Sequence, residues 1–118
     1  MIGRTDSAQV LGMEEAVIRL KLAADAGADV CFIEGVKTAE LLKDTVAALA
    51  PKPVLVNVIS GGLTPSFTCQ EAEDMGAKII SAYQMSYGGL LHSLFAPKYS
   101  PLFHASLQYM VFVLPCVP

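Results

Sequence analysis

The sequence predicts an α/β fold with a parallel sheet, and two observations lead to this prediction. Short apolar stretches alternate with segments of helical periodicity, and the predicted strands begin near residues 2, 29, 53 and 78. A helix therefore separates each strand from the next, an order that makes neighbouring strands parallel with right-handed crossovers. An open doubly wound sheet and part of a (β/α)₈ barrel both fit this order, and the spacing alone does not separate them.

The first repeat begins with a short strand, Met1–Gly3, that runs directly into Arg4. A helix is predicted over 12–26, because its apolar residues recur at helical spacing and most of its charges fall on the other face. Gly27 stands where a glycine commonly ends a helix. The next strand is the apolar run Val30–Ile33, whose length and composition are typical of a strand buried on both faces.

The later repeats follow the same pattern. A second helix is predicted over 38–50 and is stopped by Pro51. The strand Val54–Val56 comes next, and a capping-box pattern beginning at Thr68 starts a short helix that runs to about residue 75. The last predicted strand covers 78–81. A domain of about this size can bury a substantial core, as the 53% of hydrophobic residues also indicates.

Composition excludes several classes of function. The net charge is −3 and basic residues do not cluster, so no nucleic-acid surface is expected. No apolar stretch reaches about 18 residues, so no membrane-spanning helix is expected. Arg4 and Asp6 interrupt any signal-peptide core. The three cysteines are odd in number and widely spaced, which favours free thiols and a cytoplasmic or mitochondrial protein.

Polar residues stand at the downstream ends of three successive strands. Arg4, Glu34 and Asn57 each follow or end an apolar run, and the carboxyl ends of parallel strands meet on one face, where ligands bind in barrels and open sheets alike. Arginine offers a planar fork for a carboxylate, asparagine an amide, and glutamate an acceptor for a hydroxyl group or for water on a cation. Each residue alone could be a solvated strand end. Together they predict a binding site, in which Arg4 and Asn57 would suit carboxylate or carbonyl oxygens of a ligand.

At this point the sequence resembles a known superfamily. The stretches that carry the resemblance are Arg4-Thr5-Asp6, Ala26-Gly27-Ala28-Asp29, Phe32-Ile33-Glu34-Gly35, Pro53-Val54-Leu55-Val56-Asn57 and Gly61-Gly62-Leu63-Thr64-Pro65. In order and spacing they are similar to the isocitrate lyase/phosphoenolpyruvate mutase superfamily, closest to its methylisocitrate lyase, dimethylmalate lyase and oxaloacetate hydrolase branch. The resemblance runs from residue 1 to about residue 80.

The resemblance implies a (β/α)₈ barrel and a magnesium-dependent lyase or hydrolase. Such an enzyme acts on a carbon–carbon bond of a small 2-oxo or 2-hydroxy dicarboxylic acid through an enolate, with Mg²⁺ and fixed donors stabilising the developing charge. It implies that Arg4 holds a substrate carboxylate and that Glu34 is catalytic, at the substrate or the metal-bound water. Asn57 and the Val58-Ile59 backbone would bind the other end of the substrate. Thr64 is a weaker candidate for the same pocket.

The sequence also departs from that superfamily. The family's magnesium carboxylates and catalytic-cysteine loop lie upstream of the arginine strand, so the chain is expected to hold the last four βα units of eight, with no metal ligand of its own. We therefore expect the isolated chain to be inactive. Cys31 is predicted to lie in the core and Asp6 in a turn. Gly88 stands where methylisocitrate lyases carry a further substrate arginine, which favours a smaller acid.

The C-terminal part has a different character. We predict a partial barrel domain over 1–96, including a short helix near 90–94, and an irregular apolar tail over 97–118. Its apolar run, 107–114, could be a strand covering a sheet edge, a helix given to a partner, or sequence not selected to fold here, which we favour. The alternative function is a non-catalytic half-barrel that self-associates or binds a partner. A homo-oligomer is expected if the chain folds.

Overall fold

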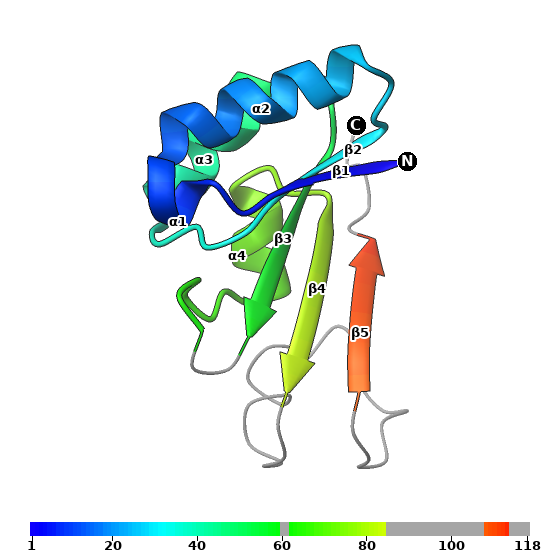
Figure 1. The fold of residues 1–118 in the computed structure, drawn as a ribbon. Coiled ribbons are helices and arrows are strands. Elements are labelled where there is room, and N and C mark those ends of the chain that lie inside the picture. Colours follow the sequence, from blue (N-terminus) through cyan, green and yellow to red (C-terminus); the bar gives the residue numbers. More distant parts are fainter. Residues whose placement is uncertain (60–61, 85–107, 114–118) are drawn as a thin grey trace.

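The computed structural model describes residues 1–59, 62–84 and 108–113, and it describes side chains as far as residue 81. Five strands and four helices follow one another along this part of the chain (Figure 1). In order they are β1 (Ile2–Thr5), α1 (Ala8–Leu11), α2 (Met13–Asp25), β2 (Val30–Ile33), α3 (Ala39–Leu49), β3 (Val54–Ile59), α4 (Cys69–Asp74), β4 (Ile79–Gln84) and β5 (Gln108–Val113).

The strands form one sheet in the order β1-β2-β3-β4-β5. The first four strands are parallel to their neighbours, which confirms the predicted parallel α/β fold. The register aligns Arg4 with Phe32, Phe32 with Leu55, and Leu55 with Ile79, so one row of residues crosses the four strands. Side chains in such a row point to the same face of the sheet.

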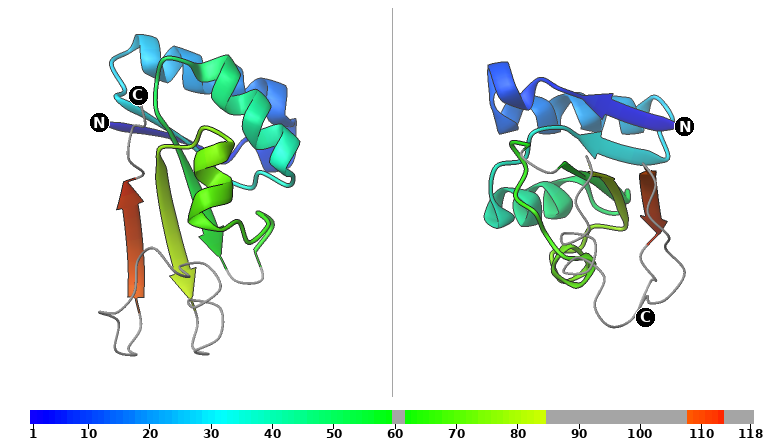
Figure 2. Two further views of the ribbon diagram at one scale, coloured as in Figure 1. Left: turned by 180° about the vertical axis from the view of Figure 1, so that it is seen from behind. Right: turned by 90° about the horizontal axis from the view of Figure 1, so that it is seen from below.

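The helices lie on one face of this sheet. Helices α3 and α4 lie behind the sheet in the view of Figure 1 and in front of it in the left view of Figure 2, and α2 packs beside α3 on β1 and β2. The core fills the space between the helices and the sheet, and its members are Ala16, Leu20, Cys31, Ile33, Val36, Leu42, Leu49, Val54, Val56, Val58, Phe67, Cys69, Ala72, Met75, Ala77 and Ile80. Helices on a single face are typical of a barrel wall, whereas a doubly wound sheet carries helices on both faces.

Local signals explain where the helices begin and end. The hydroxyl of Thr68 accepts a hydrogen bond from the Glu71 N–H at 3.1 Å, and the Glu71 carboxylate accepts one from the Thr68 N–H at 2.8 Å, which completes the predicted capping box of α4. Gly27 and Gly76 follow α2 and α4 with φ of +107° and +90°, values that favour glycine.

The structure differs from the predicted elements in two respects: it has an additional short helix, and two of its strands are longer. A short helix, α1, lies between β1 and α2 and was not predicted. Strands β3 and β4 also extend beyond the apolar runs from which they were predicted. The added length is due to their pairing, which covers five residues from Leu55 with Ile79 to Ile59 with Tyr83.

The predicted irregular tail is not supported over residues 108–113. These residues form β5, which pairs antiparallel with β4 from Gln84 with Gln108 to Ile79 with Val113. The segment is rich in aromatic and β-branched residues, which favour strands, and β4 offers it an edge. Of the alternatives given for this run, the strand that covers a sheet edge therefore describes it better than the favoured one, sequence not selected to fold here. The predicted helix at 90–94 and the domain boundary at 96 lie outside the described residues.

Within the described residues, no helix has the length and apolar character needed to cross a membrane.

Candidate functional site

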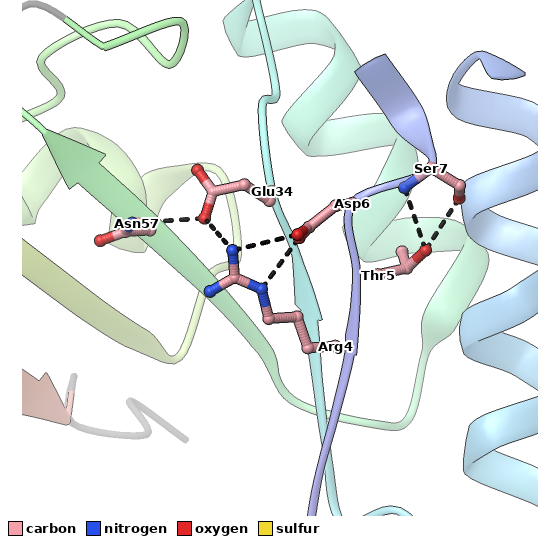
Figure 3. A network of polar contacts seen from close by, with 6 residues as sticks. All are labelled: Arg4, Thr5, Asp6, Ser7, Glu34 and Asn57. Atoms are coloured by element: carbon pink, nitrogen blue, oxygen red, sulfur yellow. Dashed lines mark hydrogen bonds and ion pairs between the residues drawn. The ribbon is translucent and has the colours of Figure 1, made fainter. Parts of the chain in front are cut away.

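The candidate site lies at the carboxyl ends of β1, β2 and β3, on the face of the sheet that the helices leave open. Arg4 belongs to β1, Glu34 follows β2 directly, and Asn57 belongs to β3. The structure brings these three predicted side chains into one network of polar contacts (Figure 3). Parallel pairing accounts for this, because the backbone N–H of Glu34 donates to the carbonyl of Thr5 at 3.1 Å and so continues the ladder between β1 and β2.

Arg4 is held from three directions. Its Nε donates to Oδ1 of Asp6 at 2.8 Å, and its Nη2 donates to Oδ2 of the same carboxylate at 3.4 Å. The same Nη2 lies 3.3 Å from Oε2 of Glu34. The guanidinium carbon lies 4.7 Å from the centre of the Phe32 ring, within the range of a cation–π contact. The plane of the guanidinium is therefore fixed by two carboxylates and one aromatic ring.

Glu34 and Asn57 form the more buried end of the network. The Glu34 side chain is 16% exposed, and its Oε2 accepts a hydrogen bond from Nδ2 of Asn57 at 3.3 Å. Asn57 is 5% exposed, and its Oδ1 is buried without a hydrogen-bond partner among the described residues. A carboxylate oxygen can only accept hydrogen bonds, so the amide nitrogen must face Glu34 and the amide oxygen must point elsewhere.

Asp6 is the site residue that the sequence interpretation missed. We predicted a turn residue at this position, and the structure places its carboxylate on Arg4. The only signal in the sequence is a carboxylate two residues beyond the arginine. The turn itself is also present, because the Ser7 N–H donates to Oγ1 of Thr5 at 3.3 Å and the two hydroxyl groups lie 2.8 Å apart.

The remaining predicted residues lie at or beyond the end of β3. The side chain of Val58 belongs to the core on the helix-covered face, so only its backbone could serve the site. The carbonyl of Ile59 accepts a hydrogen bond from the Gly62 N–H at 2.8 Å. Thr64 is buried in the loop before α4, and in the described part of the chain its hydroxyl makes no hydrogen bond to Glu34 or Asn57. The roles predicted for these residues remain predictions.

The donors of this network do not suit a magnesium ion. Among the described residues, no group of three or more His, Cys, Asp and Glu side chains is placed to hold a metal. Both nearby carboxylates, those of Asp6 and Glu34, already face the Arg4 guanidinium, whose positive charge opposes a divalent cation beside it. These residues are suited instead to bind and orient a polar organic ligand.

The two buried cysteines lie away from this chemistry. Cys31 and Cys69 are free and pack in the core, as predicted for Cys31. Burial raises the pKa of both thiols, which disfavours the reactive thiolate. Neither cysteine has the environment of a nucleophile.

The sequence of this chain is similar to that of known proteins. The family model described as Phosphoenolpyruvate phosphomutase matches residues 1–95. The petal death protein of Dianthus caryophyllus is 36% identical over 81 residues, which are 69% of this chain and 25% of that protein. The chain thus spans about a quarter of the length of the curated relatives it matches.

Two solved structures are similar in both sequence and fold. A crystal structure of 2,3-dimethylmalate lyase, a member of the PEP mutase/isocitrate lyase superfamily, matches with a TM-score of 0.65 and 48% identity, covering 67% of this chain and 28% of that one. Oxaloacetate acetylhydrolase in complex with the inhibitor 3,3-difluorooxalacetate matches with a TM-score of 0.65 and 47% identity, covering 67% and 27%. The sequence match over most of the chain and the shared fold agree, and the chain belongs to the phosphoenolpyruvate phosphomutase family, within the PEP mutase/isocitrate lyase superfamily.

Proposed function

We propose that this chain carries the acid-binding part of a magnesium-dependent carbon–carbon lyase or hydrolase. The substrate would be a small 2-oxo or 2-hydroxy dicarboxylic acid that reacts through an enolate. One observation carries the proposal: an arginine, fixed by Asp6 and Phe32, stands beside Glu34 and Asn57 at the carboxyl ends of neighbouring parallel strands. The similarity to dimethylmalate lyase and oxaloacetate acetylhydrolase supports the choice of a small acid.

Each residue has a role that suits its chemistry. Arg4 would bind a substrate carboxylate through its guanidinium, whose orientation is set before the ligand arrives, so little ordering cost remains on binding. Glu34 would exchange a proton with a substrate hydroxyl, since its carboxylate is held in place by the contacts of Oε2 with Arg4 and Asn57. Asn57 and the backbone of Val58 and Ile59 would hold the opposite end of the acid.

Two further parts of the proposal concern the whole protein. The helix layer on one face of the sheet supports a (β/α)₈ barrel, in which Thr64 would approach the same pocket from its loop. Magnesium is expected from the family and would stabilise the enolate when bound. Because the residues described above do not fit a metal, their proposed roles are limited to binding, orientation and proton transfer.

Calorimetric titration of the 118-residue chain with oxaloacetate and 2,3-dimethylmalate tests the proposal. We expect both acids to bind and Arg4→Ala to weaken binding by about tenfold or more, because a charge-assisted contact is lost. Arg19→Ala is the matched control, since Arg19 also forms an ion pair through Nε, at 2.7 Å from Glu15, but on the exposed side of α2.

Turnover is measured in the same samples with and without Mg²⁺. We expect the isolated chain to release product at the background rate, because its described residues form no metal site. Equal binding by wild type and Arg4→Ala, or no binding at all, would overturn the assignment of the site. Magnesium-dependent turnover that Arg4→Ala abolishes would support the site but contradict the expectation of an inactive chain.

A further inference from the structure

Helix α2 carries apolar side chains on two opposite faces. Its buried residues, Ala16 and Leu20, belong to the core between the helices and the sheet. Ile18 and Leu22 each stand two positions from one of these residues, which is about 200° around a helix, and they are 48% and 64% exposed. In Figure 1, α2 runs along the upper border of the described part of the chain. Ile18 and Leu22, which we call the outer row, therefore face away from the core.

The charges beside the outer row are arranged in an ordered way. Exposed apolar residues alone need no explanation, since they are common on protein surfaces. Glu14 and Lys21 lie seven positions apart and so share one flank of the row. Glu15 and Arg19 share the other flank, where Nε of Arg19 lies 2.7 Å from Oε1 of Glu15. On each flank the acid lies nearer the N-terminal end of α2 and the base nearer its C-terminal end.

This order makes the face complementary to a second copy of itself in one orientation. When two identical helices pack antiparallel about a twofold axis, each flank meets the same flank of the other copy with its ends exchanged. Glu14 then faces Lys21 of the second copy, and Glu15 faces Arg19 of the second copy. The two pairs are centred at almost the same height on the helix. A single register therefore satisfies both pairs and places Ile18 beside Ile18 of the second copy.

The same charges disfavour a parallel arrangement. Two parallel copies about a twofold axis would bring opposite flanks together at equal heights. Glu14 would face Glu15 of the second copy and Lys21 would face Arg19, and such like charges repel each other. The row is also flanked by as many acids as bases, which gives no preference for an anionic membrane surface. The pattern thus specifies one occupant, one orientation and one register.

We infer that the outer row of α2 and its four flanking charges form a contact with a second copy of this chain, packed antiparallel about a twofold axis beside Ile18. The row supplies the apolar centre of the contact and the charges supply its polar rim. Helix α2 has 13 residues and is about 20 Å long, so the contact is small, and we expect a weak dimer with a Kd of roughly 100 µM. The contact lies on the helix-covered side of the sheet, opposite the candidate site, and it does not depend on acid binding.

Charge reversal tests the register. Sedimentation equilibrium measures self-association of the full chain from about 1 µM to about 1 mM, with Ile2→Lys in every sample to oppose pairing at the free edge of β1. Glu14→Lys or Lys21→Glu alone should weaken the dimer about tenfold, because each replaces two attractions with two repulsions. An equimolar mixture of the two variants should associate as tightly as the parent chain, since each lysine then meets a glutamate again.

Two substitutions on α3 are the matched controls. Lys43→Glu and Asp44→Lys change the net charge by the same amounts, and both residues are exposed. Each control should change the dimer constant less than about twofold, alone or mixed with the other, because α3 lies outside the proposed contact. The far-ultraviolet spectrum and the melting temperature show whether each variant is folded.

Disulfide trapping tests the position of the axis in a chain with the natural Ile2. Ile18→Cys should crosslink to its own copy under mild oxidation, because the axis passes beside this position. Leu22→Cys should not, since the two copies of position 22 would lie about 13 Å apart along the helices. Both variants carry Cys116→Ser, so that the other thiols are those of the buried Cys31 and Cys69.

The outcomes are distinct from those that test acid binding. A parent chain that stays monomeric to about 1 mM, or a mixture of the α2 variants that fails to recover association, would overturn the inference. The α3 controls would overturn it by weakening association as much as the α2 variants do. Equal crosslinking at positions 18 and 22 would also overturn it, and this comparison stays decisive where a charge variant fails to fold. The titrations with Arg4→Ala test the candidate site separately.

Discussion

Two carboxylates face one guanidinium at the centre of the candidate site. Asp6 and Glu34 both contact Arg4, so these three groups together carry a net charge of −1. A dicarboxylic acid that approaches Arg4 is therefore attracted by the guanidinium and repelled by the carboxylates of Asp6 and Glu34. The arrangement fixes the arginine in place but weakens its attraction for an anion, a compromise between orientation and affinity.

Removing one of these negative charges should strengthen binding. We predict that Glu34→Gln binds a dicarboxylic acid about fivefold more tightly than the wild type. The substitution removes the repulsion between the Glu34 carboxylate and the ligand, a repulsion that solvent partly screens. Asp6→Asn, at the more exposed end of the network, is the companion variant and should gain less, since its carboxylate also orients Arg4. Calorimetry at low salt measures both, and weaker binding by Glu34→Gln would contradict this prediction.

The residues of the site could be predicted from the sequence only in part. Arg4, Glu34 and Asn57 could be found because each stands at the end of an apolar run, and parallel strands bring such ends together. Asp6 and Phe32 could not be identified as partners of Arg4. Their contacts depend on the direction of side chains on neighbouring strands and on a turn, which local sequence does not specify.

At the level of single elements, α4 shows how a charged cap stabilises a short helix. The Glu71 carboxylate accepts a hydrogen bond from the Thr68 backbone N–H, and this contact lowers the pKa of Glu71 below its ordinary value, with the Thr68 hydroxyl contributing next. A carboxyl group with a lowered pKa in the folded state stabilises the protein above its unfolded pKa. That stabilisation is lost as the pH falls through the folded pKa.

We predict that Thr68→Ala lowers the free energy of unfolding by about 1 kcal/mol, the usual effect of removing an N-cap hydroxyl. In the wild type, urea denaturation should show stability falling as the pH drops below the ordinary pKa of a glutamate, and Glu71→Gln should reduce this dependence. Glu73→Gln, in the same helix away from the cap, is the control. The cap is not the cause if Glu71→Gln and Glu73→Gln change the pH dependence equally.

The elements themselves were predictable to different degrees. Strands β1 to β4 and helices α2 to α4 could be predicted because periodicity, caps and terminating glycines or prolines are local signals. Helix α1 has four residues, too few to show a period. Strand β5 could not be chosen over its alternatives, since an apolar run becomes a strand here through pairing with a distant segment, Ile79–Gln84.

At the scale of the whole molecule, large apolar side chains are exposed at one edge of the sheet, over the N-terminal helices and in the loop after β3. The largest are Met1, Ile2, Val10, Leu11, Ile18, Leu22 and Leu63. Strand β1 stands at one end of the strand order, and Ile2 on it is 53% exposed. A strand edge with exposed apolar residues tends to pair with another chain, which is the basis of the alternative, self-associating function.

We predict that the chain forms a dimer or larger assembly at micromolar concentration, and that Ile2→Lys shifts it towards the monomer because a lysine at a strand edge opposes pairing. Leu63→Lys is the matched control, since Leu63 is similarly exposed at 57% but lies in the loop after β3. Light scattering coupled to size exclusion measures the mass. A monomeric wild type, or an equal response to both lysines, would exclude β1 as the interface.

The antiparallel pairing of β5 also limits what the sheet can become. A strand has two edges that can form hydrogen bonds. One edge of β4 pairs with β3, and the other pairs with β5 over all of Ile79–Gln84. Closure of a (β/α)₈ barrel would require a parallel strand to take the hydrogen-bonding groups that β5 now occupies. The two arrangements compete for a single row of backbone donors and acceptors. A chain with β5 in this position holds its sheet open, and any closed form must first release that strand.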